Sequence, residues 1–206
     1  KNLAAGVGQP TLSQGLSGAT TSSNYPQNNT DSRYYHEGGG SGRFDATQTC
    51  ASLPNANEMS WYAMYGNPRW DADKLWTTMG HLYKGGMWFK KKSVLQAEGH
   101  YSTLVSADNA TDFRTGLKDR YENTNAALIL SGVPSAADAG NYFYLPAMGL
   151  YSYGQLLYIG NEGYYWSSSA NSYLDNSAYA LYFTGGLVKV AKNSGRIFGL
   201  RVESLK

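Results

Sequence analysis

The chain has a single cysteine, Cys50, among its 206 residues. A disulfide needs two cysteines, so no intrachain disulfide can form and the fold must be held together by packing alone. Charged residues are only 16% of the sequence and the formal net charge is +2, which argues against a nucleic-acid-binding protein. No apolar run approaches the roughly 20 residues that cross a bilayer, so no transmembrane segment is expected.

The sequence also lacks the residue patterns of common catalytic and metal sites. His36, His81 and His100 show neither the HxxxH nor the HxxE spacing that zinc sites use. The glycines at 38–40 are not followed by the Lys-Ser/Thr of a phosphate-binding loop, and the serines at 167–169 lack the GxSxG pattern of a hydrolase nucleophile. We therefore expect no enzyme activity, no cofactor and no metal ion.

Aromatic residues and glycine are abundant, with 18 Tyr, 5 Trp, 6 Phe and 24 Gly. Tyrosine is too frequent to lie only in a core. Amphipathic rings on loops rich in Gly, Ser and Asn provide large contact areas at a low cost in side-chain entropy, which is typical of ligand-binding surfaces.

Composition divides the chain into two parts. Residues 1–43 are rich in Gly, Ser, Thr, Asn and Gln with almost no apolar periodicity, which predicts an irregular arm or a long loop. Residues 44–206 are expected to form the folded domain. The first residue is Lys1, so we expect a mature or truncated piece from which any signal peptide or lipid anchor has been removed.

Helix signals gather in the first half of the folded part. Asn55 and Glu58 are spaced as the N-cap and N3 residues of a capping box. Asp71 is a second start signal, followed by apolar residues at helical spacing. Helices are expected over residues 55–65, 71–83 and 111–121.

Strand signals dominate the second half. Alternating and aromatic-rich segments predict strands at 87–89, 126–130, 141–146, 163–166, 178–183, 187–190 and 197–202, with 126–130 buried. Gly185 and Gly186 predict a hairpin turn. Helices followed by an antiparallel meander correspond to an α+β fold.

The C-terminal third also carries an ordered motif. Its elements are residues 144–149, Gly154, Gly160, residues 163–169 and 178–183, Arg196, Gly199, and residues 201–202. Over residues 141–203 this order resembles the major paralogous domain family of Bacteroidetes surface proteins, which look like C-type-lectin folds. Upstream, Leu53 and Pro54 followed by Glu58 are similar to that family's helix-opening motif, with Met59 in place of its tryptophan.

The resemblance implies a C-type-lectin-like α+β fold, with helices followed by a mixed, mostly antiparallel sheet. Secreted eukaryotic lectin domains usually have disulfides, so the lone Cys50 indicates a bacterial or phage product. It also argues against the chemistry of the related formylglycine-generating enzymes, which work through cysteines. The calcium-binding tripeptides of true C-type lectins do not occur, and only Asp175 and Asn176 leave calcium as an alternative.

Variable proteins of diversity-generating retroelements share this ending, and the Asn, Ser, Tyr and Asp residues around Trp166 look like their diversified positions. Trp166 itself is expected to pack in the core. The stretches 151–158 and 168–177, with a turn at 192–194, are expected to form one surface at the end of the sheet. The candidate ligand-binding residues are Tyr151, Ser152, Tyr153, Gln155, Tyr158, Ser169, Asn171, Tyr173, Asp175, Asn176, Lys192 and Asn193. The alternative is that these are ordinary solvent-exposed loops.

Two functions are therefore expected from the sequence. The first is an adhesin-type ligand-binding domain on a bacterial surface or phage particle, with a protein or carbohydrate ligand on another cell or phage host. The second is a structural subunit at the tip of a pilus or fimbria, whose N-terminal arm joins neighbouring subunits by strand addition. Both place the chain outside the cell, and neither fixes the ligand or the oligomeric state.

Overall fold

The computed structural model describes residues 50–206 except 79, 116–119, 124–128, 153–154, 172–176 and 196–197. The arm predicted for residues 1–43 thus lies outside the described residues. The described chain contains no helix with the length and apolar character needed to cross a bilayer. Cys50 carries a free thiol.

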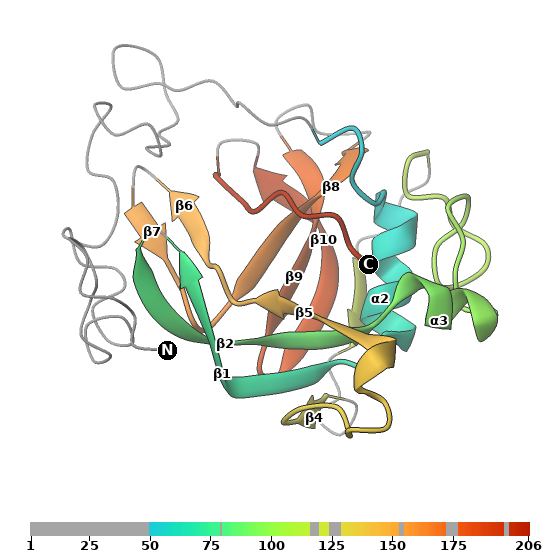
Figure 1. Ribbon diagram of the computed structural model, residues 1–206. Helices are drawn as coiled ribbons and strands as arrows, with labels where there is room; N and C mark the ends of the chain where they lie inside the picture. Colours follow the sequence, from blue (N-terminus) through green and yellow to red (C-terminus); the bar gives the residue numbers. More distant parts are fainter. Residues whose placement is uncertain are drawn as a thin grey trace, which may run out of the picture.

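The domain combines two α-helices of the described chain with twisted sheets (Figure 1). The helices are α2 (Ala56–Tyr65) and the short α3 (Lys92–Ala97), and η3 (Ala139–Asn141) is a 3-10 turn. The strands are β1 (Arg69–Thr78), β2 (His81–Lys90), β3 (Arg120–Asn123), β4 (Leu130–Ser131), β5 (Tyr142–Pro146), β6 (Leu150–Ser152), β7 (Gln155–Leu157), β8 (Gly163–Ala170), β9 (Ser177–Thr184) and β10 (Leu187–Gly195). The α+β class and the absence of a disulfide are confirmed.

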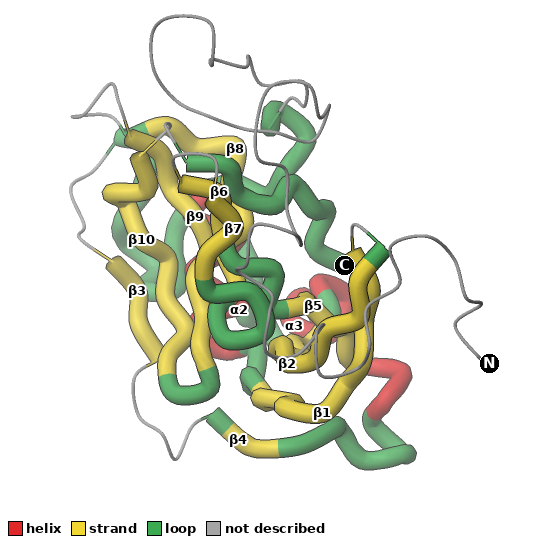
Figure 2. The backbone as a smooth tube through the Cα atoms, turned by 90° about the vertical axis from the view of Figure 1, so that its left-hand side faces the viewer, coloured by secondary structure: helices red, strands yellow, loops and turns green. Residues whose placement is uncertain are grey.

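Two four-stranded sheets and one hairpin make up the β structure. Sheet A has the order β4-β1-β2-β5, sheet B has the order β3-β10-β9-β8, and β6 pairs with β7. The pair β1–β4 is parallel and the other strand pairs are antiparallel. Figure 2 shows sheet B on one side of the domain and the strands of sheet A on the other.

Helix α2 begins where the sequence predicts it. The Asn55 side chain accepts a hydrogen bond from Glu58 N (3.0 Å), and the Glu58 side chain accepts one from Asn55 N (2.8 Å). This reciprocal pair satisfies two of the backbone N–H groups that a helix start leaves open. The capping box is confirmed.

The helix predicted at 71–83 is wrong, because this segment forms the hairpin of β1 and β2. Asp71 Oδ1 accepts hydrogen bonds from Asp73 N (3.1 Å) and Lys74 N (2.9 Å), as an N-cap would. Here the same local pattern creates an irregularity in β1 between Asp71 and Leu75. The N-terminal half of β2 is buried on both faces, so its apolar residues do not alternate as in a half-exposed strand.

Three further expectations are corrected. The helix predicted at 111–121 is wrong, because residues 113–115 form a turn and strand β3 begins at Arg120. Of the buried strand predicted at 126–130, residues 126–128 lie outside the described residues, and Leu130 lies in strand β4 but is 39% exposed. Gly199 and Arg201 form isolated bridges, where a strand over 197–202 was expected. The strands predicted at 141–146, 163–166, 178–183 and 187–190 are confirmed in β5, β8, β9 and β10, and residues 87–89 lie in β2.

The core lies between the two sheets and α2. Phe89 of β2 contacts Phe183 of β9 with ring centroids 5.8 Å apart, and Tyr62 of α2 contacts Phe143 of β5 at 5.7 Å. Tyr165 is 1% exposed and also stacks on Phe183. Because side chains alternate along β8, the neighbouring Trp166 points away from this core and is only half-buried, so its predicted place in the core is wrong.

Candidate functional site

Several strand ends meet at one end of the domain. In both Figure 1 and Figure 2, the C-terminal end of β6 lies at the same end of the domain as the C-terminal ends of β8 and β10. The last described segment joins them, because Tyr151 of β6 pairs with Gly199 and Tyr165 of β8 pairs with Arg201. The ends of β6 and β8, which belong to the stretches 151–158 and 168–177, therefore lie at the same end of the domain (Figure 1 and Figure 2).

Part of the predicted ligand surface lies outside the described residues. Tyr153, Tyr173, Asp175 and Asn176 belong to this part, and for Gln155, Lys192 and Asn193 only the backbone is described. Gln155 lies in β7. Lys192 and Asn193 lie inside β10, at an irregularity of its pairing with β9, and not in the turn predicted at 192–194.

Three predicted residues lie on or beside the β6–β7 hairpin. Tyr151 is half-buried and packs against the small core of Tyr83, Leu156 and Ile159, so its ring also supports the hairpin. Ser152 is half-buried next to it. Tyr158 is 49% exposed and has a left-handed φ of 61°, which directs the chain out of β7. Of these three residues, Tyr158 has the most accessible ring.

The sequence predicted that Ser169 and Asn171 lie on the surface. This prediction is wrong, because the two residues are buried, with 6% and 7% of their surface exposed. Strand β8 continues to Ala170, so Ser169 lies on its inward face. There the Ser169 hydroxyl accepts a hydrogen bond from Ala56 N (3.0 Å), in the first turn of α2. The hydroxyl thus satisfies a backbone donor of the helix start, and its burial follows from that contact.

A polar cleft of about 400 Å³ opens between the start of α2 and the end of β8. Its lining residues are Asn55, Arg114, Ser168, Ser169 and Ala170. Ser168 N donates to Pro54 O (3.0 Å), which ties the strand end to the segment before the helix. The side chains of Ser168 and Ala170 are exposed, so the cleft is open to solvent.

Arg114 supplies a positive charge to this cleft. Its Nε donates to both oxygens of Asp112 (2.9 and 3.1 Å), and Nη2 donates to Oδ2 (2.7 Å). Such a bidentate ion pair fixes the plane of the guanidinium group. Among the described residues no acceptor is bonded to Nη1, which leaves donors for a ligand.

Asp112 is in turn held by α2. Asn57 Nδ2 donates to Asp112 Oδ1 at 2.9 Å, so the same carboxylate contacts Arg114 and the helix. The hydrogen bonds from Arg114, followed by the one from Asn57, hold the pKa of Asp112 well below its ordinary value. The carboxylate thus stays ionised and positions Arg114 over a wide pH range.

The sequence did not identify Arg114, Asn55 or Ser168 as site residues. Arg114 falls in the segment predicted as a third helix, and Asn55 was identified only as a helix cap. Ser168 lies in the stretch 168–177 that was expected to form part of the ligand surface, but it was not among the candidate residues. No local signal marks Arg114, because its role depends on contacts between segments that are far apart in the chain. Asn55 and Ser168 meet only because β8 ends beside α2.

Comparisons with known protein families, with curated proteins and with solved structures give no match. The chemistry of the cleft is therefore argued from its own residues. In the part of the chain that the structure describes, no three His, Cys, Asp or Glu side chains are grouped to hold a metal ion. The lining instead offers hydrogen-bond donors and acceptors around one guanidinium.

The Asp112 contacts make stability depend on pH. A carboxylate whose folded pKa is lowered stabilises the fold above its unfolded pKa of about 4, and the contribution is lost as the pH falls from there through the folded pKa. We expect Asp112→Asn to unfold at lower urea concentration than the wild type at pH 7, with the difference shrinking below about pH 4. A constant difference between pH 7 and pH 2 would contradict the lowered pKa.

Proposed function

We propose that the chain is an adhesin-type ligand-binding domain with a C-type-lectin-like fold, displayed on a bacterial surface or a phage particle. Its ligand is a protein or carbohydrate on another cell or phage host. The observation that carries the proposal is the cleft at the C-terminal end of β8, at the end of the domain where the end of β6 also lies (Figure 1).

The chemistry of the cleft suits such a ligand. Arg114 offers charged donors and Ser168 a hydroxyl, and these groups can adapt to hydroxyls or peptide groups of a partner. The Asn55 amide lines the cleft but is held by its bonds with Glu58 N and Thr103 O. A volume of about 400 Å³ lies within the range of small-ligand sites. The cleft therefore suits one or two sugar units, or one side chain and its neighbouring peptide groups.

The lectin-type part of the proposal rests on the motif in the C-terminal third. Its segments 163–169 and 178–183 lie in the paired strands β8 and β9, and Gly149 pairs with Gly163 in an isolated bridge. The capping box that opens α2 supports the match to the family's helix-opening motif. A binding face at the end of β8 then coincides with the position of the variable residues that the resemblance implies.

Filling the cleft tests the proposal. Ala170→Trp adds an indole to an exposed strand position that lines the cleft, so we expect the unfolding temperature to change little and ligand capture to fall at least tenfold. Capture is measured on glycan and protein arrays, followed by titration of the best hit. Ala72→Trp is the matched control, because Ala72 is an exposed alanine of β1 on the other sheet. Equal capture by Ala170→Trp and the wild type would refute a role for the cleft.

A further inference from the structure

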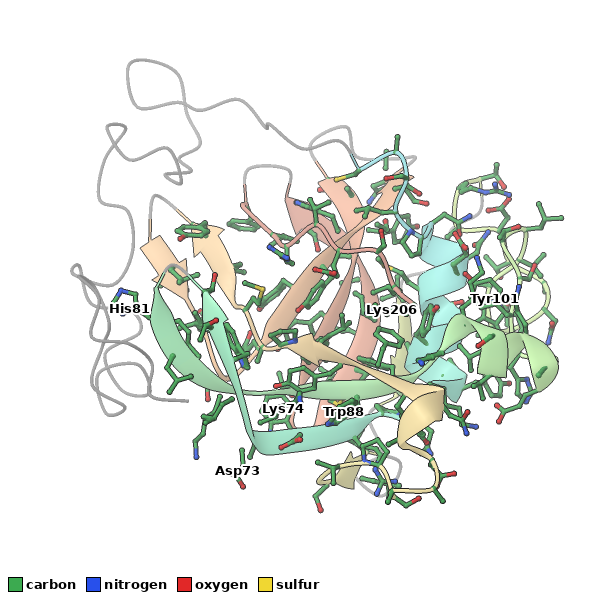
Figure 3. All side chains as sticks on the ribbon, in the orientation of Figure 1. Asp73, Lys74, His81, Trp88, Tyr101 and Lys206 are labelled. Carbon is green, nitrogen blue, oxygen red and sulfur yellow. The ribbon has the colours of Figure 1, made fainter. Side chains whose placement is uncertain are left out.

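The outer face of sheet A carries a cluster of rings and cations. Arg69, Trp88 and Tyr144 lie directly opposite one another across β1, β2 and β5, so their side chains stand in one row on one face of the sheet. The ring centroids of Trp88 and Tyr144 are 5.1 Å apart. Lys74 Nζ lies 5.0 Å from the Trp88 ring centroid and 5.3 Å from that of Tyr144. Figure 3 labels Lys74 and Trp88 at these strands.

This sheet A cluster, defined as Arg69, Lys74, Trp88 and Tyr144, lies away from the cleft. Strands β1 and β2 run along the opposite end of the domain from the C-terminal end of β8 in Figure 1 and in Figure 2. The residues on the other face of the same strands, Met87 and Phe89, are fully buried in the core. The cluster therefore faces outward and is separate from the site proposed above.

The cluster contains hydrogen-bond donors that lack acceptors. Arg69 Nε and Tyr144 Oη are buried atoms without a hydrogen-bond partner among the described residues. No carboxylate of the described chain forms an ion pair with Arg69 or Lys74. A buried donor without an acceptor destabilises the fold, so each of these two atoms needs a physical explanation. Because these two atoms are themselves closed to solvent, a ligand reaches the cluster through the exposed Lys74 ammonium and the partly exposed Arg69 side chain.

The carboxylate of Asp71, which contacts Trp88, already accepts three hydrogen bonds. Asp71 is 5% exposed and accepts hydrogen bonds from Trp88 Nε1 (3.0 Å) and from the backbone N–H groups of Asp73 and Lys74. These bonds fix the Trp88 ring and the start of the Lys74 side chain. With one carboxylate against two cations, the cluster keeps a net positive charge, which favours an anionic ligand.

A glycine makes room for the two rings. A Cβ at Gly86 would lie 2.4 Å from Tyr144 Oη and 2.6 Å from Cζ, so only glycine allows the tyrosine ring to lie over β2. Tyr144 and Trp88 together form an aromatic surface beside the unpaired donors. Burial, and then the charge of Asp71, raise the pKa of Tyr144, so its hydroxyl remains a donor at neutral pH.

We propose that the sheet A cluster is a second binding site, for an acidic saccharide. The apolar face of a uronic acid ring packs against one of the two rings, Trp88 or Tyr144, which are tilted by 56° to each other. Its carboxylate binds Lys74 Nζ, which lies over both rings, and Arg69. Aromatic rings bind the C–H face of sugars, and guanidinium groups bind carboxylates in bidentate geometry. With two cations in the cluster and a net chain charge of +2, the site suits one acid group and not a nucleic-acid backbone.

Titration with trigalacturonate and with its methyl ester tests this site. We expect the acid to bind at least tenfold more tightly than the ester, and its affinity to fall as NaCl is raised from 50 to 500 mM. Lys74→Met and Arg69→Gln should each weaken binding of the acid at least tenfold. Lys74 is exposed, so its replacement is expected to leave the unfolding temperature nearly unchanged.

Lys189→Met is the matched control, because Lys189 Nζ lies 5.0 Å from the Tyr182 ring on sheet B, and the substitution removes the same charge and the same type of contact. It should bind trigalacturonate like the wild type. Equal binding of acid and ester, unchanged binding by Lys74→Met, or tighter binding of a thymidine oligonucleotide than of trigalacturonate would overturn the proposal.

Discussion

Replacing Asn57 by alanine is expected to lower the free energy of unfolding by about 2–4 kcal/mol. Asn57 lies on α2 and its side chain is fully buried. Its Oδ1 accepts from Phe113 N (2.9 Å), and its Nδ2 donates to Asp112 Oδ1 (2.9 Å) and contacts Thr103 O (3.4 Å). One amide therefore connects the helix to both ends of the 103–113 loop, and alanine would leave the buried Phe113 N–H without its acceptor.

Urea unfolding followed by circular dichroism measures this loss. Asn161→Ala is the control, because Asn161 is an exposed asparagine in the turn after β7 and is expected to change stability by less than about 0.5 kcal/mol. The Asn57 variant should also place Arg114 less well, because Asp112 loses its contact with the helix. A variant as stable as the wild type would mean that the loop is held by other contacts.

Gly163→Ala is the second substitution with a large expected effect, a loss of about 3 kcal/mol. Gly163 and Phe183 are opposite each other in β8 and β9, and the Phe183 ring lies over the glycine. A Cβ at position 163 would lie 2.1 Å from Phe183 Cζ. The ring also packs on Phe89 and Tyr165, so it cannot move aside without disturbing the core.

Thermal unfolding of a double-mutant cycle tests this explanation. Phe183→Leu removes the ring, so in that background Gly163→Ala is expected to cost less than 1 kcal/mol. Gly186→Ala is the control, because no atom lies within 4 Å of a Cβ built at that position. Additive losses in the cycle would show that the glycine is needed for another reason.

Features that depend on local contacts could be predicted from the sequence. The start of α2 depends on two side chains three residues apart, Asn55 and Glu58, and the hairpin of β9 and β10 depends on the glycines between them. The hairpin of β1 and β2 could not be predicted, because Asp71 makes hydrogen bonds like those of a helix start in a strand irregularity. Only the pairing with β5 and the core decides between the two structures.

Prediction of the candidate site from the sequence was limited for the same reason. The ends of β6 and β8 do lie at one end of the domain (Figure 1), but Ser169 turns inward, where its hydroxyl accepts a hydrogen bond from a backbone N–H of α2, 113 residues away in the chain. Arg114 reaches the cleft through Asp112, which is held by Asn57. These are contacts between distant segments, and neither periodicity nor composition of a single segment contains them.

The segment 198–206 bears on the order in which the domain is assembled. Gly199 pairs with Tyr151, Arg201 O accepts from Trp166 N (3.0 Å), and Lys206 O accepts from Lys92 N (2.7 Å). When α2 and both sheets of a growing chain have already left the ribosome, these connections have still not formed. Since contacts between distant segments form slowly, we infer that the native arrangement is completed only after this segment has left the ribosome.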